Sequence, residues 1–161
     1  MKLGLAKMAD SHENDQKWLK EALLLAEKAA SEDEVPVGAI VVYQDQIVGR
    51  GYNLRETLQN PVAHAEVLAI QEAAQKLGSW RLTDCSLFVT LEPCPMCLSA
   101  CQLSRVKDVC YGTPDPKGGA LSLGYKVHED SRTNHRFGVR LSEMNACGEI
   151  LSRFFLNKRQ R

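Results

Sequence analysis

The segment TLEPCPMC, residues 90–97, constrains this chain more than any other stretch, because it contains a Pro-Cys-x-x-Cys motif. Two cysteines at this spacing serve as half of a structural zinc site, as a redox dithiol or as part of a catalytic metal site. Pro95 suits the first position of a helix, where its missing N–H would have no partner in any case. Proline also favours an extended backbone at Cys94, which is therefore expected to cap the helix, with Cys97 at its third position. Both sulfurs then lie at the positive end of the helix dipole, which stabilises the thiolate form that binds zinc.

A second motif, Ala-His-Ala-Glu at residues 63–66, stands upstream, where apolar residues at helical spacing predict a helix over 64–77. On a regular helix, His64 and Glu66 would point about 200° apart. They can serve one site only if both lie in the first turn and the site faces the end of the helix. We therefore expect the helix to begin near His64 rather than at the Asn-Pro pair before it. A lone histidine at a helix start is more often a capping or surface residue, but the glutamate and the downstream Pro-Cys-x-x-Cys favour a shared site.

Together the two motifs form the pattern His-x-Glu followed by Pro-Cys-x-x-Cys, which is an established signature of zinc-dependent nucleobase deaminases. His64, Cys94 and Cys97 supply three ligands, and a three-ligand zinc site with an open fourth position is catalytic. Neutral histidine and two thiolates balance the charge of Zn²⁺, which lowers the cost of burying it. Glu66 is expected not to bind the metal but to move protons between water, a ring nitrogen and the departing amine. The N–H group of Ala65 and those at the start of the second helix are candidate hydrogen-bond donors.

The six cysteines include no second Cys-x-x-Cys, so a closed four-ligand zinc site is not predicted. Cys101 shares a helix face with the motif but lies a rise of about 10 Å beyond Cys94, so we expect it to be a buried hydrophobe. Redox use of the motif would leave the upstream histidine and glutamate unexplained. The beginning of the sequence lacks the apolar region of a secretory signal, which favours a reducing, cytoplasmic compartment where cysteines are thiols or metal ligands.

Composition and periodicity describe an ordinary globular chain. Its 161 residues are 44% hydrophobic and 25% charged, with a formal net charge of zero, so the overall charge does not indicate nucleic-acid binding. We expect one domain over residues 1–161, with residues 1–13 a candidate disordered segment and no apolar run long enough to span a bilayer. The order strand, helix, strand after residue 86 predicts a parallel crossover, and the sum is a three-layer α/β domain. The expected helices are 14–30, 64–77, 95–104 and 143–157, and the expected strands are 37–43, 46–53, 86–91, 106–112 and 137–141.

Further segments outside the metal motifs match a known family. These segments are EVPVGAIVV (34–42), GYN (51–53), SRVKDVCYG (104–112), DPKGG (115–119), TNHR (133–136) and LSRFF (151–155). With them the chain resembles the bacterial tRNA-specific adenosine deaminases over most of its length. The resemblance implies the cytidine deaminase-like fold, an α/β/α sandwich with a mixed sheet of about five strands, and a homodimer with one Zn²⁺ in each subunit. It also implies conversion of adenosine to inosine at wobble position 34 of the tRNA anticodon, in a loop whose bases need no duplex opening.

The resemblance implies roles for residues outside the zinc site. Asn53 matches an asparagine that hydrogen-bonds the substrate, although its position also suits a turn asparagine that ends a hairpin. Asp115 and Lys117 match a loop beside the bound RNA, and His135 matches a position near the bound nucleotides. Of two phenylalanines on the last helix, one is expected in the core and the other, Phe155, beside the RNA groove. These assignments are expectations from the resemblance and not from the spacing of the residues.

Other interpretations stay open at this point. Deaminases of a free base or nucleoside, such as guanine or cytidine, share the zinc signature. A non-catalytic, zinc-stabilised RNA-binding module would have no use for Glu66, and redox chemistry at the cysteine pair is a further alternative. The segment 118–132 departs from the family pattern, so its conformation and substrate contacts are not predicted. The chain ends in a basic cluster that is either a solvated tail or a phosphate-contacting arm: Arg153, Lys158, Arg159 and Arg161.

Overall fold

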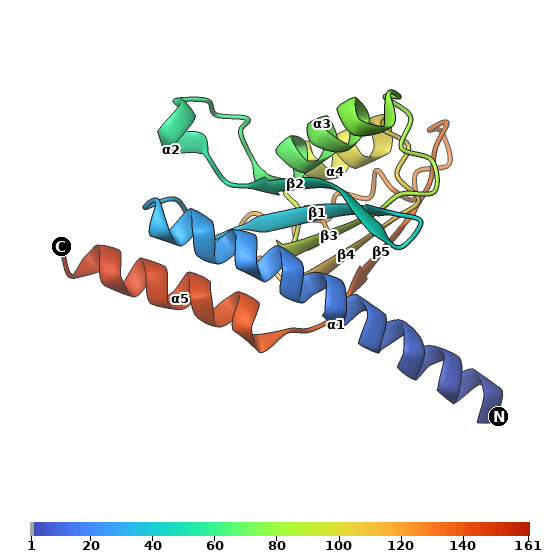
Figure 1. Ribbon diagram of the computed structural model, residues 1–161, viewed down its shortest axis with the longest axis horizontal. Coiled ribbons are helices and arrows are strands. Elements are labelled where there is room, and N and C mark those ends of the chain that lie inside the picture. Colours follow the sequence, from blue (N-terminus) through green and yellow to red (C-terminus); the bar gives the residue numbers. More distant parts are fainter. Residues whose placement is uncertain (1) are drawn as a thin grey trace.

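The computed structural model describes the backbone of residues 2–161 and the side chains of residues 10–161. Its strands are β1 (Gly38–Tyr43), β2 (Gln46–Tyr52), β3 (Ser86–Leu91), β4 (Asp108–Thr113) and β5 (Gly138–Leu141). They form one sheet in the order β2-β1-β3-β4-β5 (Figure 1). β1 pairs antiparallel with β2 and β3, whereas the pairs β3–β4 and β4–β5 are parallel. The sheet is therefore mixed, as expected, and the predicted parallel pairing around the second metal motif is confirmed.

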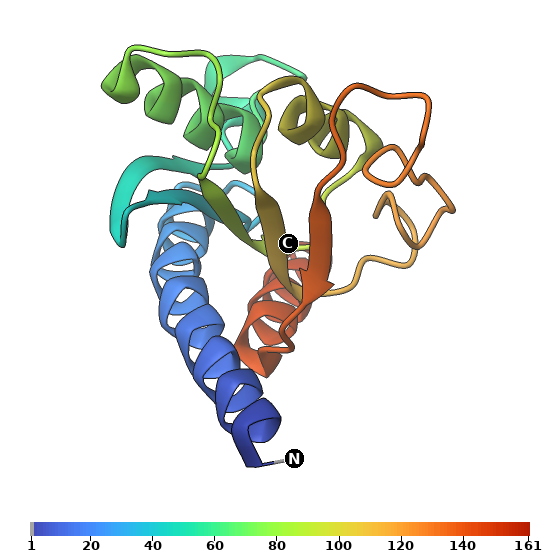
Figure 2. The same cartoon turned by 90° about the vertical axis from the view of Figure 1, so that its right-hand side faces the viewer.

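Helices cover both faces of this sheet. The helices of the described residues are α1 (Lys2–Ser31), α2 (Arg55–Leu58), α3 (Ala65–Leu77), α4 (Pro95–Leu103) and α5 (Asn145–Arg159). α1 and α5 lie on one face and α3 and α4 on the other, as Figures 1 and 2 show. The predicted three-layer α/β/α arrangement is thus confirmed. No helix in the described part of the chain combines the length and apolar character needed to cross a membrane.

The sheet separates the core into two clusters, and the interior strand β1 contributes to both. Ala39 and Val41 pack in the cluster that includes residues of α3 and α4, whereas Ile40 and Val42 pack in the cluster on the α1 and α5 side. Strand residues alternate between the two faces of a sheet, and here both faces are covered. This double burial explains why the strand is apolar throughout instead of alternating apolar and polar residues.

The two helices that begin at the metal motifs start where the sequence predicts. His64 has an extended backbone (φ −81°, ψ 152°) and α3 follows at Ala65. Cys94 is also extended (φ −70°, ψ 169°), and Pro95 is the first residue of α4. Gly51 of β2 allows α3 to lie directly against the sheet, because an added Cβ there would collide with the carbonyl oxygen of Ala65. The sheet therefore fixes the position of the helix start that carries the first motif.

The differences from the sequence expectation lie at the beginning of the chain and in the loops. α1 begins at Lys2 rather than at residue 14, so the candidate disordered segment 1–13 lies within this helix except for Met1, which is outside the described residues. The helical hydrophobic periodicity starts only near residue 14, because the turns of α1 before that residue extend past the sheet (Figure 1). The one-turn helix α2 was not expected, since four residues are too short to show a period. The segment 114–136 contains turns without a helix.

Arg140 of β5 connects the edge of the sheet to α1. Its Nη2 and Nε atoms lie 2.6 and 2.9 Å from the two carboxylate oxygens of the buried Asp15, and its Nη1 lies 2.6 Å from an oxygen of Asp108. The hydrogen bonds to these carboxylates, with that to Asp15 the strongest cause, hold the pKa of Arg140 above its ordinary value. The guanidinium group therefore neutralises a buried charge on α1.

We expect Arg140→Ala to lower the free energy of unfolding by about 2–3 kcal/mol, because it leaves the Asp15 carboxylate buried without a partner. Arg132 is a matched control, since it also forms an ion pair, with Asp130 at 2.6 Å, but its side chain is exposed. Arg132→Ala should cost only about 0–1 kcal/mol. Urea unfolding of both variants tests this, and equal losses would contradict the structural role of Arg140.

Candidate active site

His64, Cys94 and Cys97 converge at the starts of α3 and α4. The Nδ1 atom of His64 lies 3.6 Å from Sγ of Cys94 and 3.5 Å from Sγ of Cys97, and the three potential ligand atoms all lie within 4.8 Å of one another. Tetrahedral zinc bonds of about 2.0–2.1 Å to nitrogen and 2.3 Å to sulfur place such atoms about 3.5 Å apart. The three residues therefore fit one zinc ion. Among the described residues, no other group of histidine, cysteine and acidic side chains is arranged to hold a metal.

The protonation of the two sulfurs also suits a metal cation. A hydrogen bond from Cys97 lowers the pKa of Cys94 to about 4, and His64 contributes in the same direction. The same hydrogen bond, together with burial, raises the pKa of Cys97. Without metal, the pair thus shares one proton between a thiolate and a thiol. A divalent cation can take the place of this proton and stabilise both sulfurs as thiolates.

Glu66 lies in the first turn of α3, beside the three ligands but outside their group. Its side chain is buried, and burial raises the pKa of Glu66 to about 7. A hydrogen bond with Cys97 acts in the opposite direction, which places the carboxyl group next to that sulfur. A carboxyl group with this pKa can both accept and release a proton near neutral pH. This is the position that a proton-transferring, non-ligand acid needs.

A cavity of about 200 Å³ opens onto the side chains of His64, Glu66 and Cys94. It combines apolar walls with a few polar groups, which is typical of a site for a small ligand. The residues that line it are Val35, Val37, Asn53, Arg55, His64, Ala65, Glu66, Leu91, Glu92, Cys94, Asp115 and Gly118. Of the predicted substrate contacts, Asn53, Ala65 and Asp115 are thus brought to the cavity.

The buried Asn53 forms part of one wall. Its Nδ2 donates to the carbonyl oxygen of Val35 at 3.2 Å, and its Oδ1 accepts the backbone N–H of Arg55 at 3.2 Å. A side-chain amide has two N–H donors and two acceptor lone pairs, so one of each is left for a substrate. Asn53 is therefore a turn residue with further hydrogen-bonding capacity. Arg55, which sequence analysis did not single out, is the one arginine or lysine among the residues that line the cavity.

Another part of the cavity wall is formed by a loop after β4. Buried Glu92 accepts the N–H of Asp115 at 3.3 Å, and it accepts the N–H and the hydroxyl of Ser122 at 3.0 and 2.7 Å. Asp115 in turn accepts the N–H of Lys117 at 3.2 Å, which closes a turn. The Lys117 side chain is exposed and does not line the cavity. Glu92 was missed at the sequence level, because nothing in TLEPC indicates which backbone groups its carboxylate binds.

Two further predicted substrate contacts, His135 and Phe155, do not line this cavity. His135 Nε2 is 2.7 Å from the carbonyl oxygen of Val106, and its ring stacks on Phe137 with the centroids 5.7 Å apart. Val106 precedes the amino end of β4, whereas Cys94 follows the carboxyl end of the parallel strand β3, so the two lie at opposite ends of this strand pair. Phe155 is 44% exposed on α5 and also does not line the cavity. Their proposed contacts with RNA remain predictions.

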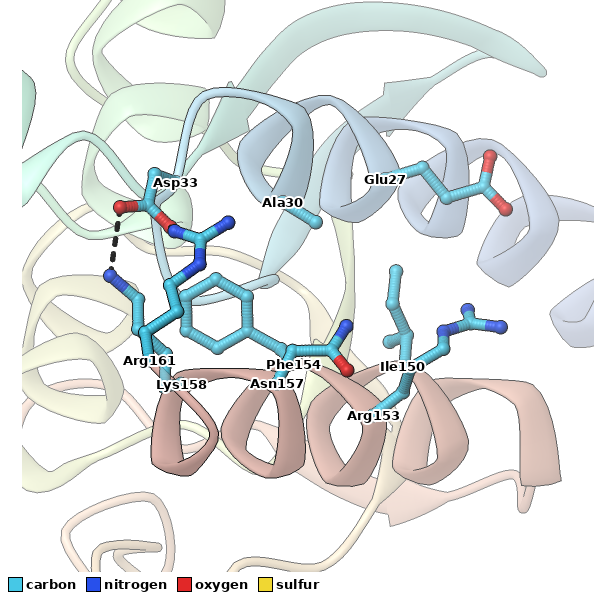
Figure 3. Close-up of a pocket in the computed structure, with 9 residues that line it drawn as sticks. All are labelled: Glu27, Ala30, Asp33, Ile150, Arg153, Phe154, Asn157, Lys158 and Arg161. Atoms are coloured by element: carbon cyan, nitrogen blue, oxygen red, sulfur yellow. Dashed lines mark hydrogen bonds and ion pairs between the residues drawn. The ribbon is translucent and has the colours of Figure 1, made fainter.

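A second cavity, of about 330 Å³, lies between the end of α1 and α5 (Figure 3). At its rim, Lys158 donates to Asp33 at 2.8 Å, and Arg161 lies 3.5 Å from the same carboxylate. The bond from Lys158 lowers the pKa of Asp33. Two residues of the basic cluster are thus bound to the end of α1 and do not form a free tail. The lining contains no histidine or cysteine, so this cavity offers none of the chemistry of the first.

Comparison with known proteins identifies the family. The sequence model of the MafB19-like deaminases matches residues 13–159. The tRNA-specific adenosine deaminase of Bacillus subtilis (strain 168) is 45% identical over 148 residues, which cover 91% of this chain and 92% of the relative. The chain belongs to the tRNA-specific adenosine deaminase family. The tRNA-specific adenosine deaminase of Aquifex aeolicus (strain VF5) is 41% identical over 138 residues, which cover 86% of this chain and 91% of that relative.

Solved structures place this deaminase among enzymes named for different substrates. A structure from a study of A-to-I editing by tRNA:A34 deaminases has a TM-score of 0.79 and 36% identity, over 84% of this deaminase and 99% of that chain. The guanine deaminase of Bacillus subtilis has a TM-score of 0.60 and 30% identity, over 89% and 93% of the two chains. The shared fold therefore supports deamination, while the substrate has to be argued from the site and from the sequence relatives.

Proposed function

We propose that this deaminase converts adenosine to inosine at wobble position 34 of the tRNA anticodon by zinc-dependent hydrolysis. The observation that carries the proposal is the group of His64, Cys94 and Cys97 with the buried Glu66 beside it. It is supported by the 45% identity over 148 residues to a tRNA-specific adenosine deaminase. The tRNA:A34 deaminase structure, with its TM-score of 0.79, supports the same substrate.

The residues of the site divide the chemistry between them. His64, Cys94 and Cys97 would hold one zinc ion, which when bound supplies the Lewis acidity that makes water a nucleophile at neutral pH. Glu66 accepts a proton from the attacking water and delivers it to a ring nitrogen; it then takes the second proton from the same oxygen and gives it to the departing amine. The water oxygen becomes bonded to the carbon that held the amino group, the carbon–nitrogen bond breaks, and ammonia leaves. Because burial raises the pKa of Glu66 to about 7, its carboxyl group can both accept and release a proton near neutral pH.

The cavity suits one base of a longer nucleic acid. Its volume of about 200 Å³ lies below the range of about 300–1,000 Å³ that is common for drug-sized ligands. The first N–H groups of α3, including that of Ala65, have no acceptor within the helix, so they can contribute to binding the base along with Asn53. An anticodon-loop base can enter while its sugar and phosphates stay outside. The basic side chains of Arg55 and Lys117 would then face the RNA backbone.

We further propose that the protein acts in the cytoplasm as a homodimer that binds the tRNA anticodon stem-loop. Leu58, Val62 and Leu103 are each more than 45% exposed and supply apolar surface that a second copy can cover. Lys117, His135 and Phe155 are proposed RNA contacts outside the base cavity. Light scattering should give a mass near twice the 17.9 kDa of the chain, and a monomer at micromolar concentration would contradict the dimer.

Asn53→Ala is expected to lower kcat/KM for an anticodon stem-loop by about 10- to 100-fold, because one buried hydrogen bond to the base and the local turn are both lost. Zinc content should not change. Asn60→Ala is the matched control, since Asn60 makes a similar turn bond to the N–H of Val62 at 3.0 Å but does not line the cavity. Inosine formation under single-turnover conditions measures both variants. Equal activity of the two would remove Asn53 from the binding site.

A panel of substrates separates the proposed function from its alternatives. The zinc-loaded protein is incubated with a stem-loop that has adenosine at position 34, and separately with adenosine, guanine and cytidine, and ammonia is measured. We expect release from the stem-loop alone. The likeness to a guanine deaminase at a TM-score of 0.60 makes guanine the second candidate, and release from guanine alone would favour it. Tight stem-loop binding without any release would favour a non-catalytic RNA-binding module.

A further inference from the structure

Glu34 is a buried acid outside the group of catalytic candidates. Its side chain is 1% exposed, in the segment between α1 and β1. Its Oε1 accepts the backbone N–H of Thr57 at 2.6 Å, and its Oε2 accepts that of Glu56 at 3.3 Å. Buried carboxylates are usually paired with a cation, but the ion pairs of residues 10–161 include none with Glu34. Among residues 10–161, its hydrogen-bond partners are therefore two backbone N–H groups of one short helix.

These backbone groups belong to the same segment as two cavity residues. They lie in α2, whose early N–H groups have no acceptor within the helix. The segment is also bonded to the chain next to Glu34, since Asn53 donates its backbone N–H to the oxygen of Val37 at 3.1 Å. The side chain of Asn53 donates to Val35 and accepts the N–H of Arg55, both at 3.2 Å. The segment that carries Asn53 and Arg55 is thus bonded to residues 34–37, with Glu34 supplying the charged contacts.

We propose that Glu34 is a positioning residue that holds α2 so that Asn53 and Arg55 face the active-site cavity. Hydrogen bonds between an ionised acceptor and N–H groups are stronger than neutral ones, so Glu34 fixes this turn more firmly than water would. Removing the carboxylate frees the N–H groups of Glu56 and Thr57 and allows the turn to move. The inference rests on the proposed function because it assigns the cavity to the substrate base.

The first test compares two buried carboxylates of the holoenzyme. In an assay run well below the melting temperature, Glu34→Ala should lower kcat/KM for the A34 stem-loop by about 10- to 100-fold. Its zinc content should not change. Asp15 is the matched control, because it is also buried but binds Arg140 on the far face of the sheet. Asp15→Asn should lower the melting temperature and leave kcat/KM unchanged. Equal losses of kcat/KM in both variants would overturn the positioning role.

A conservative variant separates positioning from folding. Glu34→Gln retains an oxygen for the short bond to Thr57 and loses only the longer bond to Glu56. We expect it to keep kcat/KM within about threefold of the wild type, because one good acceptor is enough to hold the turn. A loss as large as that of Glu34→Ala would overturn the inference.

A double variant tests whether Glu34 acts through Asn53. Residues that act through one another give non-additive effects. The double variant Glu34→Ala, Asn53→Ala should therefore be no more than about threefold less active than Asn53→Ala alone. Full multiplication of the two single losses would overturn the proposal that Glu34 holds Asn53 in position.

Hydrogen exchange decides the inference independently of activity. In the zinc-loaded protein without substrate, Glu34→Ala should speed amide exchange within residues 53–58 and leave β1 unchanged. If the wild type formed no inosine, the proposed function would fail, and this measurement would still test Glu34. Unchanged exchange over 53–58 would overturn the positioning role.

Discussion

Replacing Glu66 with glutamine is expected to lower kcat for inosine formation by about 10²–10⁴-fold. The glutamine keeps the size of the side chain but cannot take a proton from water or return one to the departing amine. Because Glu66 stands beside the ligand group and not in it, zinc should stay at one ion per chain. The measurement is inosine formed per enzyme under saturating stem-loop, combined with elemental analysis of the same sample.

The control for this substitution lies on the same helix. Glu72 of α3 is exposed and accepts the backbone N–H of Arg50 at 2.9 Å, away from the cavity. Glu72→Gln should leave kcat and zinc content unchanged. If Glu66→Gln kept wild-type kcat, proton transfer by Glu66 would be excluded, although the zinc site itself could stand.

Replacing Cys94 with alanine is expected to abolish both zinc binding and inosine formation. Two ligands do not complete the protein part of a catalytic zinc site, so metal affinity should fall by several orders of magnitude. Elemental analysis after dialysis measures the bound zinc, and the stem-loop assay measures activity. A Cys94→Ala protein with one tightly bound zinc and normal activity would contradict the ligand assignment.

Cys101 provides the matched cysteine. It lies in α4, the helix that Cys94 precedes, is fully buried, and is not part of the ligand group. Burial raises the pKa of Cys101 above the ordinary range of a thiol, as expected for an inert core residue. Cys101→Ala should therefore keep zinc and activity while losing about 1 kcal/mol of stability through the small cavity that it leaves. Loss of zinc in both variants would indicate a general folding defect.

The starts of the metal-site helices could be predicted from the two motifs. Pro95 favours a helix that begins at its own position, and only a helix that begins near His64 lets His64 and Glu66 reach one site. The strand at 86–91 has the predicted bounds, since it is a short apolar run that is buried in the sheet. Where a few neighbouring residues determine the backbone, the sequence is sufficient to place the chemistry.

The walls of the cavity could not be predicted because their causes are tertiary. Glu34 binds α2 over a separation of more than twenty residues, and Glu92 binds Ser122 over a separation of 30. No periodicity or motif indicates such partners. The contact of His135 with Val106 spans 29 residues in the same way, and the RNA contact that the resemblance implies for His135 stays a prediction. Long-range hydrogen bonds of single side chains are the part of the site that required the structure.

The most direct test of the account is to map inosine in a full-length tRNA transcript with adenosine at position 34. We expect one inosine per transcript, at that position, after incubation with the zinc-loaded protein. A transcript with its anticodon adenosine moved to position 35 should remain unmodified. No inosine in the first transcript, or equal conversion in the second, would contradict wobble-specific deamination by this protein.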